Sequence, residues 1–335
     1  METALCHILG IEKPIISAPM GGAAGPELVA AVSDAGGFGV IPLWGGPVEQ
    51  VHSGIEQVCA LTDRNFAVNL NLSFPYKDQL QACIEKKVAA VSLFWGMEPS
   101  AIETAKRGGL IVLASVGNSE EARIAADAGA DVIVAQGWEA GGHVWGKVAT
   151  MALVPAVVDA VDVPVVAAGG IADGRGMAAA LMLGASGVWI GTRLLASKEA
   201  TIHDLYRQRI LDASEDQTEW YRELYDVDWP DAPHRALSNP TSEAWKDAGS
   251  PRPGQRPGEN DVIGHRPSGD AIVRYQSHTP KPGTKGDVAA MSLWAGQGVS
   301  MAREIMPASA IVDEIYRDAR RVMESGYSSL LGKQD

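Results

Sequence analysis

The chain has 335 residues, of which 46% are hydrophobic and 21% are charged, and its formal net charge is −13 at pH 7. This length and composition fit one large α/β domain or two domains of average size, with enough apolar residues for an extensive core. The acidic excess argues against nucleic acid and membrane surfaces as partners, because phosphate binding draws on Lys and Arg.

The cysteines, histidines and apolar stretches exclude further classes. Cys6, Cys59 and Cys83 lie far apart and predict a reducing compartment, the cytoplasm, rather than a disulfide framework. The seven histidines form no H-E-x-x-H motif and no cluster with cysteine, so we expect no metal site. We expect no signal peptide, because the N-terminus lacks a basic start followed by a long apolar core. We expect no membrane span, because proline and aspartate interrupt the most apolar region, residues 148–171.

Short apolar runs alternate with alanine-rich helical stretches from residue 14 to about residue 200. Eight runs have the character of strands: PIISA (14–18), FGVI (38–41), FAVNL (66–70), VAAVSLF (88–94), LIVLAS (110–115), DVIVA (131–135), VPVVAAGG (163–170) and GVWIGT (187–192). Their apolar residues are continuous, as in parallel strands that are buried on both faces. Eight βα units in series predict a closed α/β TIM barrel, (β/α)8, which we favour over an open doubly wound sheet.

Capping residues support this phasing. Asn118, with Glu121 three residues later, predicts the start of a helix, and Asp173 predicts another; Gly129 and Gly184 are expected to end them. The run GRGMAA (174–179) matches a dinucleotide-binding motif, but it lies inside the second of these helices and no suitably placed acidic residue follows. We interpret its glycines as sites of close helix packing.

The sequence changes in character after residue 197. A polar helical stretch is expected to run to about residue 225, and a segment rich in Pro, Gly and charge follows to about residue 290. Its aromatic residues argue against disorder, so we interpret it as a lid or a homo-oligomer contact. We divide the chain into a barrel core (1–200), a helical and Pro/Gly-rich insertion (201–300) and a C-terminal region (301–335) whose amphipathic helix, residues 307–325, packs on the barrel.

Glycines follow the last two predicted strands. Gly169 and Gly170 come after the seventh strand, and Gly191 and Thr192 come after the eighth. Because the carboxyl ends of barrel strands meet at one mouth, these residues predict a phosphate cradle with helix N-termini behind it. Either pair alone would fit an ordinary tight turn.

Other strand ends carry polar or soft side chains. Asn69 and Gln136 either bond neighbouring backbone or serve a ligand with donor and acceptor edges, and having two such amides favours the ligand. Met20 is either core filler or an apolar surface beneath a flat ring. His143, after the flexible EAGG, suits proton transfer or stabilisation of negative charge; the alternative is a core histidine satisfied by Glu139 or a carbonyl. Together these residues predict a phosphorylated heteroaromatic cofactor, for which FMN is the natural candidate.

Several motifs together resemble the nitronate monooxygenase family: PIISAPMGG (14–22), FAVNL (66–70), QGWEAGGH (136–143), AAGGIADGRGMAAALMLGASGVWIGT (167–192) and LWAGQG (293–298). The resemblance implies an FMN-dependent barrel that oxidises alkyl nitronates with molecular oxygen. It implies that the following residues hold FMN: Asn69, Gln136, Gly141, Gly170, Trp189, Ile190, Gly191 and Thr192. It also implies that Met20 lies near the isoalloxazine and that His143 binds the nitro group or acts as a base.

Two departures from the family pattern touch the substrate mouth. Val144 and Trp145 follow His143, where family members often have a basic residue and glycine, and the segment over residues 226–290 is long. Two alternative functions therefore stay open. One is an NAD(P)H-dependent flavin reductase acting on a quinone or an enoyl acceptor, and the other is a non-redox barrel that binds a sugar phosphate.

Overall fold

The computed structural model describes residues 1–330, and its centre is a sheet of eight parallel strands. The strands are β1 (Ile15–Ser17), β2 (Gly39–Pro42), β3 (Phe66–Asn71), β4 (Ala90–Phe94), β5 (Ile111–Val116), β6 (Val132–Gln136), β8 (Val165–Ala168) and β9 (Gly187–Ile190). They pair in the order β1-β9-β8-β6-β5-β4-β3-β2. Phe38, just before β2, exchanges backbone hydrogen bonds with Ile15 and Ser17 of β1. These bonds join the two ends of the sheet, which confirms the predicted barrel.

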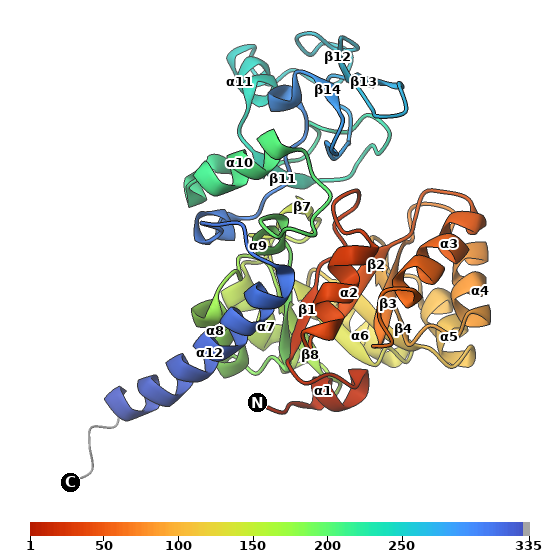
Figure 1. Cartoon of the computed structure of the whole chain (residues 1–335), viewed down its shortest axis with the longest axis vertical. Coiled ribbons are helices and arrows are strands. Elements are labelled where there is room, and N and C mark those ends of the chain that lie inside the picture. The colour runs from red at the N-terminus through yellow and green to blue at the C-terminus, as the bar shows by residue number, and fades with distance from the viewer. Residues whose placement is uncertain (331–335) are drawn as a thin grey trace.

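Helices surround this sheet (Figure 1). They are α2 (Pro26–Asp34), α3 (Val48–Cys59), α4 (Lys77–Glu85), α5 (Pro99–Arg107), α6 (Ser119–Asp127), α7 (Thr150–Val158), α8 (Gly174–Met182) and the single turn α9 (Thr192–Leu195). The first helix, α1 (Ala4–Leu9), lies at the amino end of the barrel, where Leu5 and Leu9 pack into the interior cluster. The amino end is therefore plugged.

Successive residues of each strand face either the barrel interior or the surrounding helices. In β6, Val132 and Val134 belong to the interior cluster, whereas Ile133 packs among residues that face the helices. In β9, Trp189 is interior and Ile190 faces the helices. The last interior-facing side chain of each strand therefore contributes to the floor of the barrel mouth.

The predicted helix boundaries at two loops are confirmed. The Asn118 side chain accepts the backbone N–H of Glu121 at 2.9 Å and begins α6. Asp173 begins α8 by accepting two backbone N–H groups of its first turn. Gly129 and Gly184 follow these helices with φ of +98° and +96°, a conformation that favours glycine.

The C-terminal helix α12 (Ala308–Leu330) packs on α8 and α2. A Cβ at Gly174 would lie 2.4 Å from the backbone nitrogen of Ala319, so only glycine allows α8 this approach. This contact confirms that the GRGMAA run serves helix packing. Ile311 and Ile315 form the buried face of α12, as expected from its amphipathic pattern.

The insertion lies over the carboxyl end of the barrel (Figure 1). It contains α10 (Asp204–Asp212), β10 (Thr218–Tyr221), β11 (His234–Leu237), α11 (Pro240–Asp247), β12 (Val262–His265), β13 (Ala271–Val273) and β14 (Lys285–Gly286). Three 3-10 turns, η1 (Glu215–Gln217), η2 (Val288–Ala290) and η3 (Gln297–Met301), complete it. Strands β12, β13 and β14 form one small sheet, while β10 and β11 form another with β7 (Gly142–His143), which belongs to the loop after β6. The insertion and the barrel thus share a sheet at His143.

The predicted helix to about residue 225 is wrong. The helix α10 ends at Asp212, and Thr218–Tyr221 form a strand instead. Thr218, Trp220 and Tyr221 are residue types that favour strands, and the backbone of β11 supplies their partners. The three-part division of the chain and the role of the insertion as a lid or oligomer contact stay predictions, and residues 331–335 of that division lie outside the described chain.

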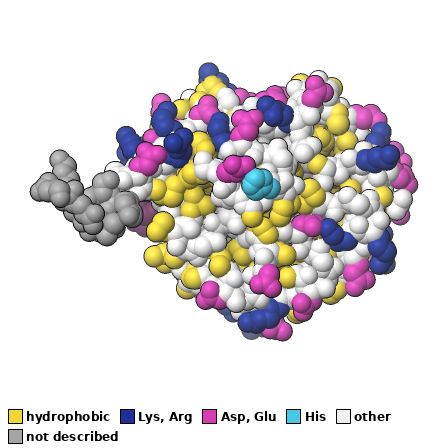
Figure 2. All heavy atoms as spheres, turned by 90° about the horizontal axis from the view of Figure 1, so that it is seen from below, with side chains coloured by type: hydrophobic (Ala, Val, Ile, Leu, Met, Phe, Trp, Pro, Cys, Tyr) yellow, Lys and Arg dark blue, Asp and Glu magenta, His cyan; other side chains and the backbone are white. Residues whose placement is uncertain are grey.

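The barrel face opposite the insertion carries charges of both signs. Figure 2 shows Lys and Arg interspersed with Asp and Glu on this face, together with scattered hydrophobic side chains. Within residues 1–330, none of the helices has the length and apolar character needed to cross a membrane.

Candidate active site

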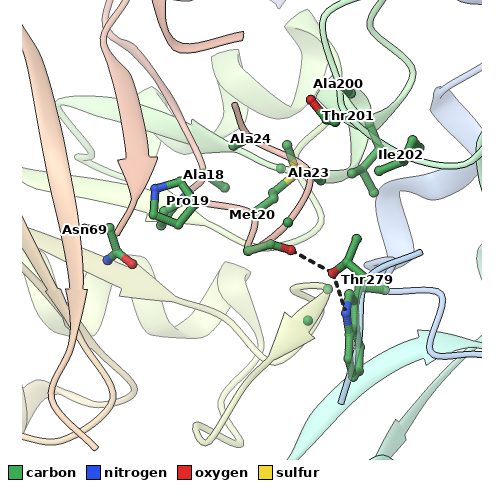
Figure 3. Close-up of a pocket in the computed structure, with 18 of the residues that line it drawn as sticks. Ala18, Pro19, Met20, Ala23, Ala24, Asn69, Ala200, Thr201, Ile202 and Thr279 are labelled. Atoms are coloured by element: carbon green, nitrogen blue, oxygen red, sulfur yellow. Dashed lines mark hydrogen bonds between the residues drawn. The ribbon is translucent and has the colours of Figure 1, made fainter. Parts of the chain in front are cut away.

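A cavity of about 1280 Å³ lies at the carboxyl end of the barrel, beneath the insertion. Its floor includes the interior-facing residues at the ends of several strands: Asn69, Ser115, Gln136, Ala168 and Trp189. Its roof comes from the insertion and includes Trp229, Ser277, His278, Thr279 and Trp294. Figure 3 shows Thr279 of the roof beside the loop that carries Met20. The Thr279 hydroxyl donates to the Gly21 carbonyl at 2.7 Å and joins roof to barrel.

The structure brings almost all of the sequence-predicted site residues to this cavity. Its lining includes Met20, Asn69, Gln136, Gly141, His143, Gly169, Gly170, Trp189, Gly191 and Thr192. Ile190 is the exception, because its side chain is fully buried and faces the helices. The Ile190 carbonyl accepts the backbone N–H of Ala18 at 2.8 Å, so this residue positions the neighbouring loop through its backbone.

The glycines after β8 and β9 form an open concave surface. Gly169 and Gly170 have φ of +104° and +71°. A Cβ at Gly169 would lie 2.8 Å from the Gly137 carbonyl oxygen, and one at Gly191 would lie 3.3 Å from the Ala18 Cβ. Glycine is therefore needed at position 169 for both conformation and space, and without side chains the three glycines leave backbone along this part of the cavity wall.

The helices behind this surface are less favourable for an anion than the sequence predicted. The helix α8 begins only at Gly174, and the Asp173 carboxylate already accepts two of its first N–H groups. The helix α9 does start at Thr192, but it has four residues and hence a small dipole. The Thr192 hydroxyl accepts the Gly296 N–H at 3.0 Å. Any anion here would depend on loop N–H groups more than on helix dipoles.

The two amides differ in how their polar atoms are satisfied. The Asn69 amide nitrogen donates to the Ser92 carbonyl at 3.1 Å. Neighbouring backbone thus satisfies this atom, which is one of the two alternatives that the sequence left open. The Gln136 amide nitrogen donates to the His143 carbonyl at 3.2 Å, whereas its oxygen Oε1 is buried without a partner. A buried acceptor of this kind is costly unless a ligand donates to it.

Both imidazole nitrogens of His143 face a partner in the insertion. Nδ1 lies 3.2 Å from the Ala232 carbonyl oxygen, and Nε2 lies 3.3 Å from the Ser277 hydroxyl. A carbonyl can only accept, so we assign the proton to Nδ1, and the Ser277 hydroxyl then donates to the lone pair of Nε2. Backbone pairing of His143 with His234 in β11 fixes the strand that carries the ring. His143 therefore lines the cavity, and a backbone carbonyl also satisfies one of its ring nitrogens.

Aromatic rings surround the His143 side chain. Trp229 has its ring centroid 3.9 Å from that of His143, and Trp294 and Trp95 lie at 5.3 and 5.7 Å. Desolvation, and secondly repulsion from His234, holds the pKa of His143 well below its ordinary value of 6.5. The ring is therefore neutral at physiological pH and presents a basic nitrogen rather than a positive charge.

The EAGG segment serves packing within the protein. The Glu139 carboxylate accepts the backbone N–H and the hydroxyl of Thr150 at 2.8 and 2.9 Å, so Glu139 is not the partner of His143. A Cβ at Gly141 would lie 2.4 Å from the backbone nitrogen of Gly296. Gly141 therefore allows the LWAGQG segment to approach the loop that carries His143.

Sequence reasoning missed the residues that the insertion contributes. Ser277, His278 and Thr279 are consecutive in the run SHTP, which has no repeat or known motif and stands in a Pro-rich segment. Trp294 lies within LWAGQG, a motif noted above without a role. Within the described chain, no group of three or more His, Cys, Asp or Glu residues could hold a metal ion.

The two residues after His143, at which the sequence departs from the family pattern, pack within the protein. Val144 is fully buried, and the Trp145 indole donates to the Glu121 carboxylate at 3.2 Å. The Trp145 ring also contacts Trp95 and Phe94, with centroids 5.2 and 5.3 Å apart. An apolar wall therefore stands in this chain where a basic residue would otherwise follow the histidine.

The chain is similar to known proteins over most of its length. A family described as nitronate monooxygenase matches residues 2–81 and 71–318. A nitronate monooxygenase from Pseudomonas aeruginosa is 32% identical over 368 residues, covering 96% of this chain and 100% of the relative.

Two further proteins are similar over most of the chain. A dehydrogenase from Rhodococcus jostii, whose name specifies a hydroxy-methyl-oxo-octahydroindene carboxyl-CoA, is 36% identical over 253 residues, covering 75% of this chain and 70% of the relative. The structure of FabK from Thermotoga maritima has a TM-score of 0.85 and 34% sequence identity, and the match covers 98% of this chain and 99% of that one.

Proposed function

This chain belongs to the nitronate monooxygenase family, and we propose that it oxidises alkyl nitronates with molecular oxygen by means of FMN bound at the carboxyl end of the barrel. The chain is an oxidoreductase that acts on small molecules. The observation that carries the proposal is that the uncovered glycine surface, the unpartnered oxygen of Gln136 and the basic nitrogen of His143 border one cavity.

Features of the cavity fit FMN. The buried Gln136 Oε1 needs a donor, and a ring N–H of an isoalloxazine is one. The glycine surface at Gly169, Gly170 and Gly191 would hold the phosphate through backbone N–H groups, and Met20 offers an apolar surface for the ring. Bound there, FMN would supply the redox chemistry by taking electrons from the substrate and passing them to oxygen.

His143 has a defined part in such a reaction. Since its Nδ1 proton is directed to the Ala232 carbonyl, the side that faces Ser277 is a lone pair. Nε2 can take a proton from the carbon of a neutral nitroalkane when the Ser277 hydroxyl turns away. A nitronate is already deprotonated and needs no such step. The geometry therefore favours the base over a cationic binder of the nitro group, the two roles that the family resemblance implies.

The aromatic rings around His143 exclude water from the reacting region. Trp95, Trp229 and Trp294 surround the imidazole, and Trp145 extends the wall behind Trp95. Exclusion of water strengthens each polar contact made inside the cavity and keeps the base neutral.

A visible absorption spectrum and an anaerobic reduction test the proposal together. We expect the purified protein to bind FMN and to show flavin absorbance. We expect an alkyl nitronate to bleach that absorbance under anaerobic conditions, and admission of air to restore it. A protein that stays colourless after incubation with FMN would contradict the cofactor, and a flavin that a nitronate does not bleach would contradict the reaction.

An NAD(P)H-dependent flavin reductase is the second candidate. Its support is the similarity to the Rhodococcus dehydrogenase and to FabK, together with a cavity larger than a nitronate requires. Rapid bleaching by NADH or NADPH in the same cuvette would favour this candidate. Membership of an oxidoreductase family removes the non-redox sugar-phosphate alternative. Homo-oligomer formation and a cytoplasmic location stay predictions.

A further inference from the structure

A five-residue segment of the insertion, residues 277–281, crosses the mouth of the cavity, and we call it the strap. Two of its contacts tie it to the barrel side: the Ser277 hydroxyl lies 3.3 Å from His143 Nε2, and Thr279 donates to the Gly21 carbonyl. The strap backbone is also held, because the Pro280 carbonyl accepts the His203 N–H at 2.9 Å. The strap is thus a fixed wall of the site.

The side chain of His278 points to a missing ligand. Only 9% of this residue is exposed, it lines the cavity, and its Nε2 has no hydrogen-bond partner. Its backbone is satisfied by Ser292, whose hydroxyl donates to the His278 carbonyl and accepts its N–H. A buried imidazole nitrogen left without a partner is costly, whereas an anion or hydroxyl of a bound molecule would satisfy it.

Two cations lie close to this histidine. Arg266 and Lys281 line the same cavity, and neither forms an ion pair with a carboxylate among residues 1–326. Burial first, and then the charges of Arg266 and Lys281, lowers the pKa of His278 to about 4. The strap with Arg266 therefore presents two unpaired positive charges and a neutral imidazole to one region of the cavity.

None of the carboxylates that line the cavity or act on His278 forms an ion pair with Arg266 or Lys281. Glu199 accepts the Ala308 N–H at 2.8 Å, and Asp204 is paired with Arg207 at 3.5 Å. Asp228, which acts on His278 electrostatically, accepts the Gln276 amide at 2.6 Å. Arg266 and Lys281 therefore have no carboxylate partner of their own in the described part of the chain.

The space available exceeds what FMN and a nitronate need. Pockets for one drug-sized ligand measure roughly 300–1,000 Å³, whereas this cavity measures about 1280 Å³. The glycine surface and Gln136 lie at the barrel floor, while His278 and the two cations belong to the roof. Room therefore remains for a second, extended molecule that reaches from His143 to the strap.

We propose that the strap and Arg266 bind a phosphate group of a second, extended molecule whose other end reaches the flavin beside His143. The inference rests on the proposed function, because it assumes FMN at the barrel floor. Phosphate oxygens suit two cations and a donor imidazole nitrogen. Coenzyme A thioesters and NADP(H) both carry such phosphate groups on an extended molecule, and they are the two sources that the experiment separates.

Calorimetric titration of the FMN-loaded enzyme tests the proposal. Coenzyme A, NADP⁺ and unphosphorylated adenosine are the probes, and the FMN content is measured by absorbance in each sample. We expect at least one phosphorylated probe to bind, with an affinity that falls as salt is raised, and adenosine to bind much more weakly. Binding of coenzyme A alone identifies a thioester substrate, and binding of NADP⁺ alone identifies a nucleotide electron donor.

Charge-removing variants locate the bound phosphate. We expect Arg266→Ala and Lys281→Ala each to weaken the probe by about tenfold, the fold-change for losing one charged hydrogen bond. Lys285→Ala is the matched control, because Lys285 is exposed on β14 and does not line the cavity. Its probe affinity should equal that of the wild type.

Several results would overturn the proposal. They are the absence of phosphorylated-probe binding to FMN-loaded enzyme, equal binding of adenosine, and an equal loss in the Lys285→Ala control. Loss of FMN instead of probe affinity in Lys281→Ala would assign the strap to the flavin phosphate and would also overturn it. If the wild type holds FMN and is bleached by a nitronate but binds no probe, this inference fails while the proposed function stands.

Discussion

The floor and the roof of the cavity are built in different ways. The floor comes from the ends of barrel strands, where alternation along each strand decides which side chains face inward: Asn69, Gln136 and Trp189 are examples. The roof comes from irregular chain and small sheets in the insertion, and residues such as Ser277 and Trp229 reach the cavity through loops. In the floor, every second residue of a strand faces the cavity. In the roof, no such short-range pattern indicates which residues face it.

His143 is held by both regions, so the barrel and the insertion act on the same side chain. Its backbone follows β6 of the barrel, but Ala232 and Ser277 of the insertion hold its two ring nitrogens. The barrel thus delivers the imidazole to the cavity, and the insertion sets its tautomer and basicity. Substitutions in the two regions should therefore affect different quantities: cofactor retention for the floor, and the acid–base behaviour of His143 for the roof.

The largest effect is expected where the two regions meet. His143→Asn should lower turnover of a neutral nitroalkane by about a hundredfold or more, the scale of one positioned acid or base, and should leave FMN bound. Steady-state kinetics and flavin absorbance measure the two quantities. His7→Asn is the control, since His7 is exposed on α1 at the far end of the barrel. Unchanged turnover in the His143 variant would remove this residue from the mechanism.

The floor is tested by Gly169→Ala. The new Cβ would meet the Gly137 carbonyl at 2.8 Å in a left-handed conformation, so we expect FMN affinity to fall by about tenfold or more. Fluorescence titration of FMN measures the change. Gly249→Ala is matched for conformation, with φ of +80°, but has open space around its Cβ. A similar loss of FMN in both variants would mean that backbone strain, and not the cradle, is responsible.

The roof is tested by the acid sensitivity of stability. Burial lowers the pKa of His234 from 6.5 to about 4, so below pH 6.5 the unfolded chain binds a proton that the folded chain does not. Stability should therefore fall as the pH drops from 6.5 towards 4, by about 1.4 kcal/mol per pH unit for this one group. Urea unfolding at several pH values gives the slope, to which His143 and His278 add in the same direction.

The slope separates titration from simple loss of packing. His234→Gln should be less stable at neutral pH, but its stability should depend on pH less steeply than that of the wild type, by the same 1.4 kcal/mol per unit. An equal slope in the two proteins would show that His234 does not titrate on unfolding in this range.

The smallest effect is expected from Ser277→Ala. Its hydroxyl donates to the neutral form of His143, so its removal should raise the pKa of His143 and shift the acid limb of kcat/KM for a neutral nitroalkane upward. Above that limb we expect kcat/KM to rise by up to about fivefold, because Nε2 no longer has to give up a neutral hydrogen bond of about 1 kcal/mol before it takes a proton. Ser268→Ala, on an exposed part of the insertion, is the control. An unshifted pH profile would exclude Ser277 as a partner of the base.

The fold was predictable where the pattern was local and regular. All eight strands appear where continuous apolar runs indicated them, and the caps at Asn118 and Asp173 start helices as expected. The helix expected to residue 225 failed, because Thr218–Tyr221 find β-strand partners far away in sequence. The face to which each strand residue points was not assigned from the sequence, and the structure turns the Ile190 side chain towards the helices; that Ile190 helps to hold FMN stays a prediction.

The part of the candidate site that lies at strand ends was predictable from the sequence, and the part in the insertion was not. Motifs at strand ends identified the floor residues and His143, since a parallel barrel brings strand ends together whatever joins them. No local signal indicated that His278, Arg266 and Lys281 of the insertion would line the same cavity.

The amino-acid sequence by itself determined the barrel and the glycine, amide and histidine side chains at its mouth, because these follow from short-range periodicity and turn chemistry. Only the tertiary structure decided which nitrogen of His143 carries the proton, that Gln136 keeps a free buried acceptor, and that two cations stand unpaired above the cavity. These properties arise from contacts between residues far apart in sequence. Long loops bring these residues together, and no repeating sequence pattern predicts the contacts.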